Sequence, residues 1–152
     1  GGMCMLVSCD VAKLGIFPNP DLFFGFEELD FCLKVSRKGF KILVDCKLFL
    51  EARKKYGRLE FQRGNYKRKD NLVREYYSLR NLLLISDSMT LNRMKWQLTK
   101  KWILKSVYGF RYGVSYGFRN FKYIMLAFYH YKVRKFGFTI SLTENGQPLR
   151  TN

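Results

Sequence analysis

The sequence predicts an α/β portion followed by a mostly α-helical region that is rich in basic and aromatic residues. In residues 1–50, short apolar runs typical of buried strands flank a helical pattern, and six basic residues balance six acidic ones. In residues 88–143 there is no acidic residue, although eleven Lys and Arg and fourteen aromatic residues occur there. The formal net charge of +16 therefore comes wholly from residues 51–152. With 152 residues, 47% of them apolar, the chain is long enough to bury a core.

The first twenty-one residues predict a strand, a single helical turn and a loop. Residues 2–8 form a continuous apolar run that suits a strand buried on both sides. Asp10 can cap a turn over residues 11–14, which Gly15 closes, and two prolines make residues 16–21 a loop. The four cysteines lack zinc-site spacing, so we expect reduced thiols and no metal site among them.

Residues 22–39 contain the densest group of acids, with Glu27, Glu28 and Asp30 within four residues. Their spacing predicts a helix that ends at Gly39. Its narrow face is expected to consist of Leu29, Cys32, Leu33 and Ser36. Negative charge at a helix N-terminus is stabilising by roughly 0.3 to 1 kcal/mol, and Lys34 can pair with Asp30 one turn on. A purely structural interpretation of these acids is therefore open.

The residues directly before these acids favour a chemical role instead. Phe23, Phe24, Gly25 and Phe26 bring apolar groups and a flexible backbone up to two adjacent carboxylates. A carboxylate that loses solvation to aromatic neighbours is suited to taking a proton from a hydroxyl.

The next residues predict two strands, a basic loop and a long helix. Residues 40–44 and 46–50 have the pattern of strands, and residues 52–71 form a basic loop that glycines interrupt. This loop is either a solvated surface or a lid that meets a diphosphate. Asp70 or Asn71 then caps a helix through about Ser86. The residues on its buried side are Leu72, Tyr76, Leu79 and Leu83, whereas Tyr77, Arg80 and Asn81 share another face.

The acid-free residues 88–143 have the composition of helices that lie in a membrane interface. Their apolar runs fall short of the roughly 18 to 20 residues that span a bilayer. Aromatic groups interleaved with cations suit the acyl boundary and anionic headgroups. The expected membrane-docking residues are Trp96, Trp102, Lys100, Lys101 and Lys105.

Two motifs resemble family 2 glycosyltransferases, which are inverting enzymes of the GT-A fold. The first is the aromatic run followed by Glu-Glu-x-Asp, a basic residue and a glycine, here Phe24, Glu27, Glu28, Asp30, Lys34 and Gly39. The second is Tyr-Tyr-x-x-Arg-Asn at residues 76–81, which is similar to a motif of rhamnosyl- and galactosyltransferase-like members. Residues 123–137 resemble the closing helix of the same enzymes, with a basic cluster and a glycine at its end. The sequence departs from the family at Glu28, where Asp is usual, and at Leu50, where a His is common.

The resemblance implies that residues 1–70 are the C-terminal, acceptor-side part of a GT-A catalytic domain. Residues 71–142 would be a helical membrane-docking region and residues 143–152 a flexible tail. The implied catalytic base is Glu28, and the implied acceptor-binding residues are Glu27, Asp30, Phe24 and Gly25. The implied donor or diphosphate contacts are Gly1, Gly2, Arg53 and Lys54.

The implied activity is inverting transfer of a sugar from a nucleotide-sugar donor to a saccharide or lipid-linked acceptor in cell-surface polysaccharide synthesis. The enzyme would be peripheral to the cytoplasmic face of the cell membrane. The chain would need the nucleotide-binding half of the parent protein, which also holds the main ligands of a Mg²⁺ or Mn²⁺ ion, and alone it would be inactive.

Two other functions remain open at this point. A basic, aromatic-rich chain can neutralise phosphates and stack on bases, as a nucleic-acid-binding module does. It can also be a non-catalytic protein of the membrane surface. Nucleic-acid binding is expected to depend strongly on salt and not on lipid, whereas interfacial docking requires anionic vesicles.

Overall fold

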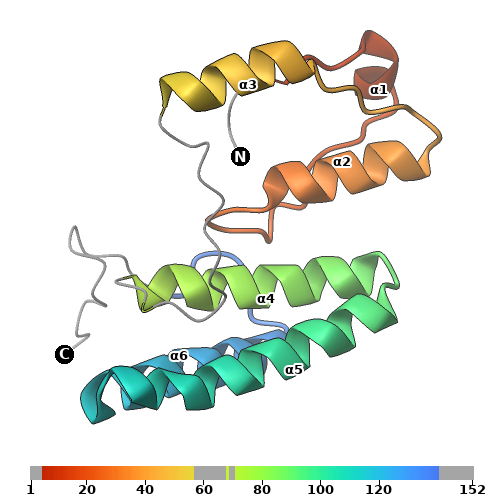
Figure 1. Cartoon of the computed structure of the whole chain (residues 1–152). Helices are drawn as coiled ribbons and strands as arrows, with labels where there is room; N and C mark the ends of the chain where they lie inside the picture. Colours follow the sequence, from red (N-terminus) through yellow and green to blue (C-terminus); the bar gives the residue numbers. More distant parts are fainter. Residues whose placement is uncertain (1–4, 57–67, 69–70, 141–152) are drawn as a thin grey trace.

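The computed structural model describes residues 5–56, 68 and 71–140, and every regular element in these residues is helical. The elements are α1 (Cys9–Lys13), α2 (Glu27–Arg37), α3 (Cys46–Lys55), α4 (Leu72–Ser88), α5 (Asn92–Tyr108), the short 3₁₀ helix η1 (Gly109–Tyr112) and α6 (Val114–Lys132) (Figure 1). The described residues contain no strand, so the predicted α/β fold with part of a GT-A sheet is wrong for them.

The predicted strands fail because a strand needs a neighbour to accept and donate its backbone hydrogen bonds. Residues 5–8 and 40–44 are extended or irregular and have no neighbouring strand in the described part of the chain. Residues 46–50 instead begin α3, because the Oδ1 atom of Asp45 accepts a hydrogen bond from the backbone N–H of Leu48 at 2.9 Å and caps the helix. Residues 52–55, predicted as loop, continue that helix.

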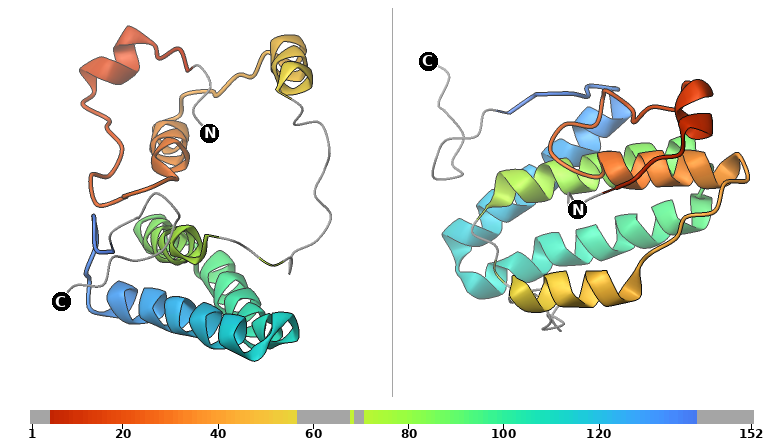
Figure 2. Two further views of the ribbon diagram at one scale, coloured as in Figure 1. Left: turned by 90° about the vertical axis from the view of Figure 1, so that its left-hand side faces the viewer. Right: turned by 90° about the horizontal axis from the view of Figure 1, so that it is seen from above.

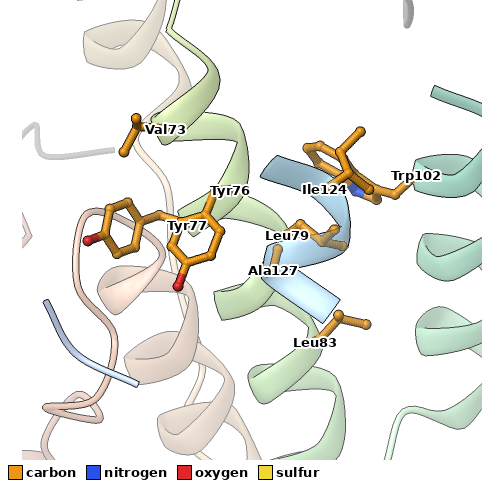
Figure 3. Packing of buried hydrophobic residues seen from close by; sticks show 8 residues of the cluster. All are labelled: Val73, Tyr76, Tyr77, Leu79, Leu83, Trp102, Ile124 and Ala127. Atoms are coloured by element: carbon orange, nitrogen blue, oxygen red, sulfur yellow. The ribbon is translucent and has the colours of Figure 1, made fainter. Parts of the chain in front are cut away.

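Helices α4, α5 and α6 form a three-helix bundle. Its core is the cluster of Val73, Tyr76, Tyr77, Leu79, Leu83, Trp102, Ile124 and Ala127. Figure 3 shows Leu79, Leu83, Trp102, Ile124 and Ala127 between the helices, whereas Val73 and the rings of Tyr76 and Tyr77 lie on another side of α4. The predicted buried side of α4 is confirmed, as is the predicted cap, since the side chain of Asn71 accepts from the backbone N–H of Arg74 at 2.9 Å.

Within the bundle, α4 is the helix that faces α2, and it lies between α2 and the other two bundle helices, as both Figure 1 and the left view of Figure 2 show. Leu22, which precedes α2, packs with Leu84, Ile85 and Met89 near the end of α4. The guanidinium of Arg37 donates a hydrogen bond to the carbonyl oxygen of Met89 at 2.5 Å. The start and the end of α2 are thus both fixed to the bundle.

The first two helices share a small core of their own. Val11 of α1 packs with Phe31 and Val35 of α2. The narrow face predicted for α2 is therefore wrong, since Leu29 and Ser36 are exposed while the face carrying Asp30, Phe31 and Val35 is buried. Helix α1 begins two residues before the predicted turn, and Ser8 caps it in place of Asp10.

Helix α3 has no buried residue. It lies on the side of α2 away from the bundle in Figure 1. After α6, which begins nine residues before the predicted closing helix, the chain turns and residues 133–140 run back past α4. The predicted tail at residues 143–152 lies outside the described residues.

Candidate functional site

The loop before α2 has an uncommon backbone. Phe24, Gly25 and Phe26 have φ angles of 67°, 116° and 74°, in the left-handed region. Bulky residues rarely adopt this conformation, and each one costs of order 1 to 3 kcal/mol unless the surroundings hold it. Such strain is concentrated at functional sites, and here it lies directly ahead of the three carboxylates.

Two side chains and an aromatic cluster hold this loop. The amide of Asn81 on α4 donates to the carbonyl oxygens of Phe23 at 2.8 Å and Gly25 at 3.1 Å. The Oε1 atom of Glu27 accepts from the backbone N–H of Gly25 at 3.0 Å. The ring of Phe23 meets that of Tyr77 edge-on, with centroids 5.0 Å apart. Asn81 therefore joins the two motifs that carry the resemblance, although 58 residues separate it from Phe23.

The three carboxylates of α2 have three different surroundings. Glu27 holds the loop, as described above. Glu28 is exposed, so the loss of solvation expected from its aromatic neighbours does not occur in this structure. Asp30 is 1% exposed. Of the three carboxylates, Glu28 has the most access from solvent.

Asp30 fixes the preceding loop to α2. Its Oδ2 atom accepts from the backbone N–H of Asn19 at 2.8 Å and pairs with the ammonium of Lys34 at 2.6 Å, which confirms the predicted pair. Lys34 also donates to the carbonyl oxygen of Phe17 at 3.1 Å. The other oxygen, Oδ1, is buried and has no hydrogen-bond partner within the described residues. These contacts position the loop and leave Asp30 little access to an acceptor.

Arg80 is completely buried and binds the segment that follows α6. Its Nη1 atom donates to the hydroxyl of Thr139 at 2.9 Å, and its Nη2 atom donates to the carbonyl oxygen of Gly137 at 2.8 Å. Its guanidinium also lies over the ring of Tyr77, 4.9 Å from the centroid. Hydroxyl and carbonyl acceptors thus satisfy this cation, and no carboxylate pairs with it among the described residues.

Tyr76, Tyr77 and His130 complete this buried network. The hydroxyl of Tyr76 lies 2.6 Å from Nδ1 of His130 and 2.7 Å from the hydroxyl of Thr139. The hydroxyl of Tyr77 donates to the carbonyl oxygen of Ile140 at 2.9 Å and accepts from the backbone N–H of Ile140 at 2.9 Å. Burial raises the pKa of Tyr76. Burial and the positive charges of Lys135 and Arg80 lower the pKa of His130.

The other predicted site residues are only partly brought together. Phe24 lies half-exposed at the loop, with the guanidinium of Arg74 5.9 Å from the centre of its ring. Arg53 and Lys54 lie in the last turn of α3, where Arg53 covers the ring of Phe49. Gly1 and Gly2 lie outside the described residues.

The predicted membrane-docking residues divide into two groups. Trp96, Lys100 and Lys101 are exposed on α5, with the ammonium of Lys100 over the ring of Trp96 at 4.7 Å from its centre. Trp102 is 7% exposed and belongs to the core, and Lys105 forms an ion pair with Glu75 of α4. In this fold, Trp102 packs in the core of the bundle and Lys105 joins α5 to α4 through its ion pair.

Sequence reasoning did not identify Arg74 and Thr139 as part of this site. Arg74 lies three residues after the Asn71 cap. This spacing could have indicated that its side chain extends from the first turn of α4. Thr139 had no local signal, since 59 residues separate it from Arg80.

The described residues hold no group of three or more His, Cys, Asp or Glu that could bind a metal ion. None of the helices in the described ranges is long and apolar enough to cross a bilayer. Searches of family models, curated proteins and solved structures each returned no match.

Proposed function

We propose that this chain supplies the acceptor side of an inverting glycosyltransferase and acts together with a nucleotide-binding part. The observation that carries the proposal is the pair of hydrogen bonds from the amide of Asn81 to the loop before α2. It joins the Tyr-Tyr-x-x-Arg-Asn motif to the strained loop of the Glu-Glu-x-Asp motif, so two motifs that resemble one enzyme family meet at one place. Glu28 is exposed and follows Gly25 by three residues.

In the proposed reaction, Glu28 is the general base. An acceptor hydroxyl lies against its carboxylate, and the hydroxyl oxygen attacks the anomeric carbon of the donor sugar. The hydroxyl proton moves to Glu28 as the new C–O bond forms. The bond from the anomeric carbon to the phosphate oxygen breaks, and its electron pair leaves with the nucleoside diphosphate. Attack opposite to the leaving group inverts the anomeric configuration.

The remaining residues of the loop have positioning roles in this proposal. Glu27 and Asn81 hold the backbone of residues 23–25, so the loop that carries the half-exposed ring of Phe24 has a fixed conformation ahead of Glu28. Asp30 fixes residues 17–19 to the same helix. A preorganised loop of this kind reduces the cost of orienting the acceptor.

The test is sugar transfer by the complete enzyme carrying Glu28→Gln, measured with labelled nucleotide sugars on membranes that contain the acceptor. The variant keeps the shape of the side chain and removes the proton acceptor, so we expect a loss of about a hundredfold to ten-thousandfold. Glu28→Asp is expected to keep more activity than Glu28→Gln, because it keeps a carboxylate.

Glu51→Gln is the matched control, because Glu51 is an exposed glutamate on α3. This variant is expected to transfer at the normal rate. Near-normal turnover by Glu28→Gln would rule out Glu28 as the base, and an equal loss in Glu51→Gln would point to a general charge effect.

A further inference from the structure

An exposed apolar surface lies where α5 turns into α6. Leu104 and Val114 are 61% and 67% exposed, respectively. The surface, called the corner patch below, consists of Ile103, Leu104, Val107, Val114, Phe118 and Phe121. Leu104 on α5 and Phe118 on α6 lie on the opposite side of their helices from the buried residues Trp102, Ser106, Asn120 and Ile124. Large apolar side chains exposed together where two consecutive helices meet mark a candidate interaction surface.

Close packing fixes the corner that carries this patch. The side-chain amide of Asn120 on α6 donates to the carbonyl oxygen of Lys105 on α5 at 3.0 Å. The rings of Phe110 and Phe118 meet edge-on, with centroids 5.2 Å apart. A Cβ atom on Gly117 would lie only 2.8 Å from the Cα atom of Phe110, so the two backbones approach closely. The patch is therefore part of a fixed turn between two helices.

The charged residues near the corner patch in the sequence are all basic. Exposed cations on the same helices and turn include Lys100, Lys101, Arg111, Arg119 and Lys122. Residues 88–143 contain no acidic residue. The patch thus combines an apolar centre with cations and has no carboxylate of its own segment to repel an anion.

We infer that the corner patch docks on an anionic lipid bilayer. Lipid accommodates both features at once, because the acyl boundary takes the aliphatic and aromatic side chains while anionic headgroups meet the cations. A nucleic acid would match the cations and could stack on Phe118 or Phe121. It offers no comparable partner for Ile103, Leu104, Val107 and Val114, so charge complementarity together with this aliphatic content favours the membrane.

This inference does not depend on the proposed sugar transfer. Figure 1 and the left view of Figure 2 place the corner on the side of α4 away from α2. A bilayer bound at the corner would therefore leave the loop before α2 accessible. It also moves the expected docking surface from Trp102, which is buried, and Lys105, which pairs with Glu75, to residues that the structure exposes.

The experiment is co-sedimentation of the full chain with vesicles of phosphatidylcholine mixed with phosphatidylserine, and with vesicles of phosphatidylcholine alone. We expect binding to the mixed vesicles and little to the zwitterionic ones. Leu104→Glu and Val114→Glu each remove an apolar contact and add a negative charge, so each is expected to weaken binding by about tenfold.

Leu48→Glu and Val44→Glu are matched controls, because they make the same changes at residues of similar exposure, 65% and 64%. They are expected to bind vesicles as the unchanged protein does, and the circular dichroism of all four variants checks their folding. If the control variants bound vesicles equally weakly, the corner patch would not be the docking surface, since the change in net charge alone would explain the weaker binding. Stronger binding to single-stranded DNA than to the mixed vesicles, or binding that ignores phosphatidylserine, would overturn the bilayer as its partner.

Discussion

The buried guanidinium of Arg80 shows how much of this fold depends on single side chains. A charge without solvent is costly unless several acceptors surround it. Here the acceptors are hydroxyl, amide and carbonyl oxygens, two of which belong to Gly137 and Thr139 after α6. The planar fork of an arginine can reach them together, whereas the ammonium of a lysine cannot.

Arg80→Lys is therefore expected to lower the free energy of unfolding by about 3 kcal/mol. Urea denaturation measures the change. Arg93→Lys is the control, because Arg93 is exposed on α5 and its replacement should change stability by less than about 0.5 kcal/mol. If both variants unfolded at the same urea concentration, the buried network would not contribute as described.

The two tryptophans provide a second comparison at this scale. Trp102 is in the core and Trp96 is 60% exposed, so Trp102→Ala should destabilise the protein by about 3 to 5 kcal/mol and Trp96→Ala by little. Thermal unfolding followed by circular dichroism measures both. Equal losses would mean that Trp102 is not the core residue described here.

Among the helices, α2 and α4 could be predicted from sequence because their signals are local. The acids at the start of α2, the glycine after its end and the Asn71 cap of α4 all act within one turn. The strands could not be predicted reliably, since a strand depends on partners distant in the chain and short apolar runs also suit helices. The run at residues 46–50 shows this, because the capping carboxylate of Asp45 directs it into α3.

The candidate site was predictable to the same extent. The carboxylates were identified because three of them fall within four residues, and the Tyr-Tyr-x-x-Arg-Asn residues because they resemble a family motif. The left-handed conformation of Phe24 and Phe26 was not, because bulky residues adopt it only under tertiary constraint. The buried state of Asp30 likewise depends on the distant contact with Asn19.

The turn between α5 and α6 gives a prediction about a whole element. An alanine normally stabilises a helix by about 1 kcal/mol over glycine. At Gly117 the sign should reverse, because the added Cβ would lie 2.8 Å from the backbone of Phe110 and 2.5 Å from its ring. Gly117→Ala is thus expected to be destabilising.

The control for this element is Ser115→Ala, an exposed change two residues earlier on α6, which should be neutral or slightly stabilising. Both melting temperatures can be measured by calorimetry. A higher melting temperature for Gly117→Ala would contradict the close approach of the two helices.

In the whole molecule, one carboxylate, that of Asp87, joins all three helices of the bundle. Asp87 of α4 pairs with Lys95 of α5 at 2.6 Å and accepts a hydrogen bond from the hydroxyl of Tyr131 of α6. Burial alone would raise the pKa of Asp87. The hydrogen bonds from Lys95 and Tyr131, with the charges of Lys95 and Arg134, outweigh burial and hold the pKa below its usual value.

Acid should therefore destabilise the protein in two stages. His130 has a lowered pKa when folded, so the unfolded chain binds an extra proton and stability falls as the pH drops below about 6.5. Asp87 contributes to stability when the pH is above about 3.8, the pKa of its carboxyl group in the unfolded chain. This stabilisation is lost as the pH falls through the lower pKa of Asp87 in the folded protein.

His130→Gln separates the first stage, because His130 is the sole histidine. Urea denaturation at about pH 7.5 and about pH 5.5 should show a smaller difference between the two pH values in the variant than in the unchanged protein. Asp87→Asn should keep that difference and lose the further decline near pH 4. A pH dependence that His130→Gln does not alter would contradict the buried state of this histidine.

The hydrogen bonds from Asn81 to the loop before α2 also determine the order in which parts of the chain can fold during synthesis. The loop at residues 23–25 cannot reach its left-handed conformation until Asn81 has left the ribosome and can hold it. The guanidinium next to Asn81 cannot be buried until residues 137 and 139 have followed. Nearly the whole described chain must therefore be made before the loop ahead of Glu28 is held in place, so a nascent chain that stalls before residue 137 would present this acidic segment without its final shape.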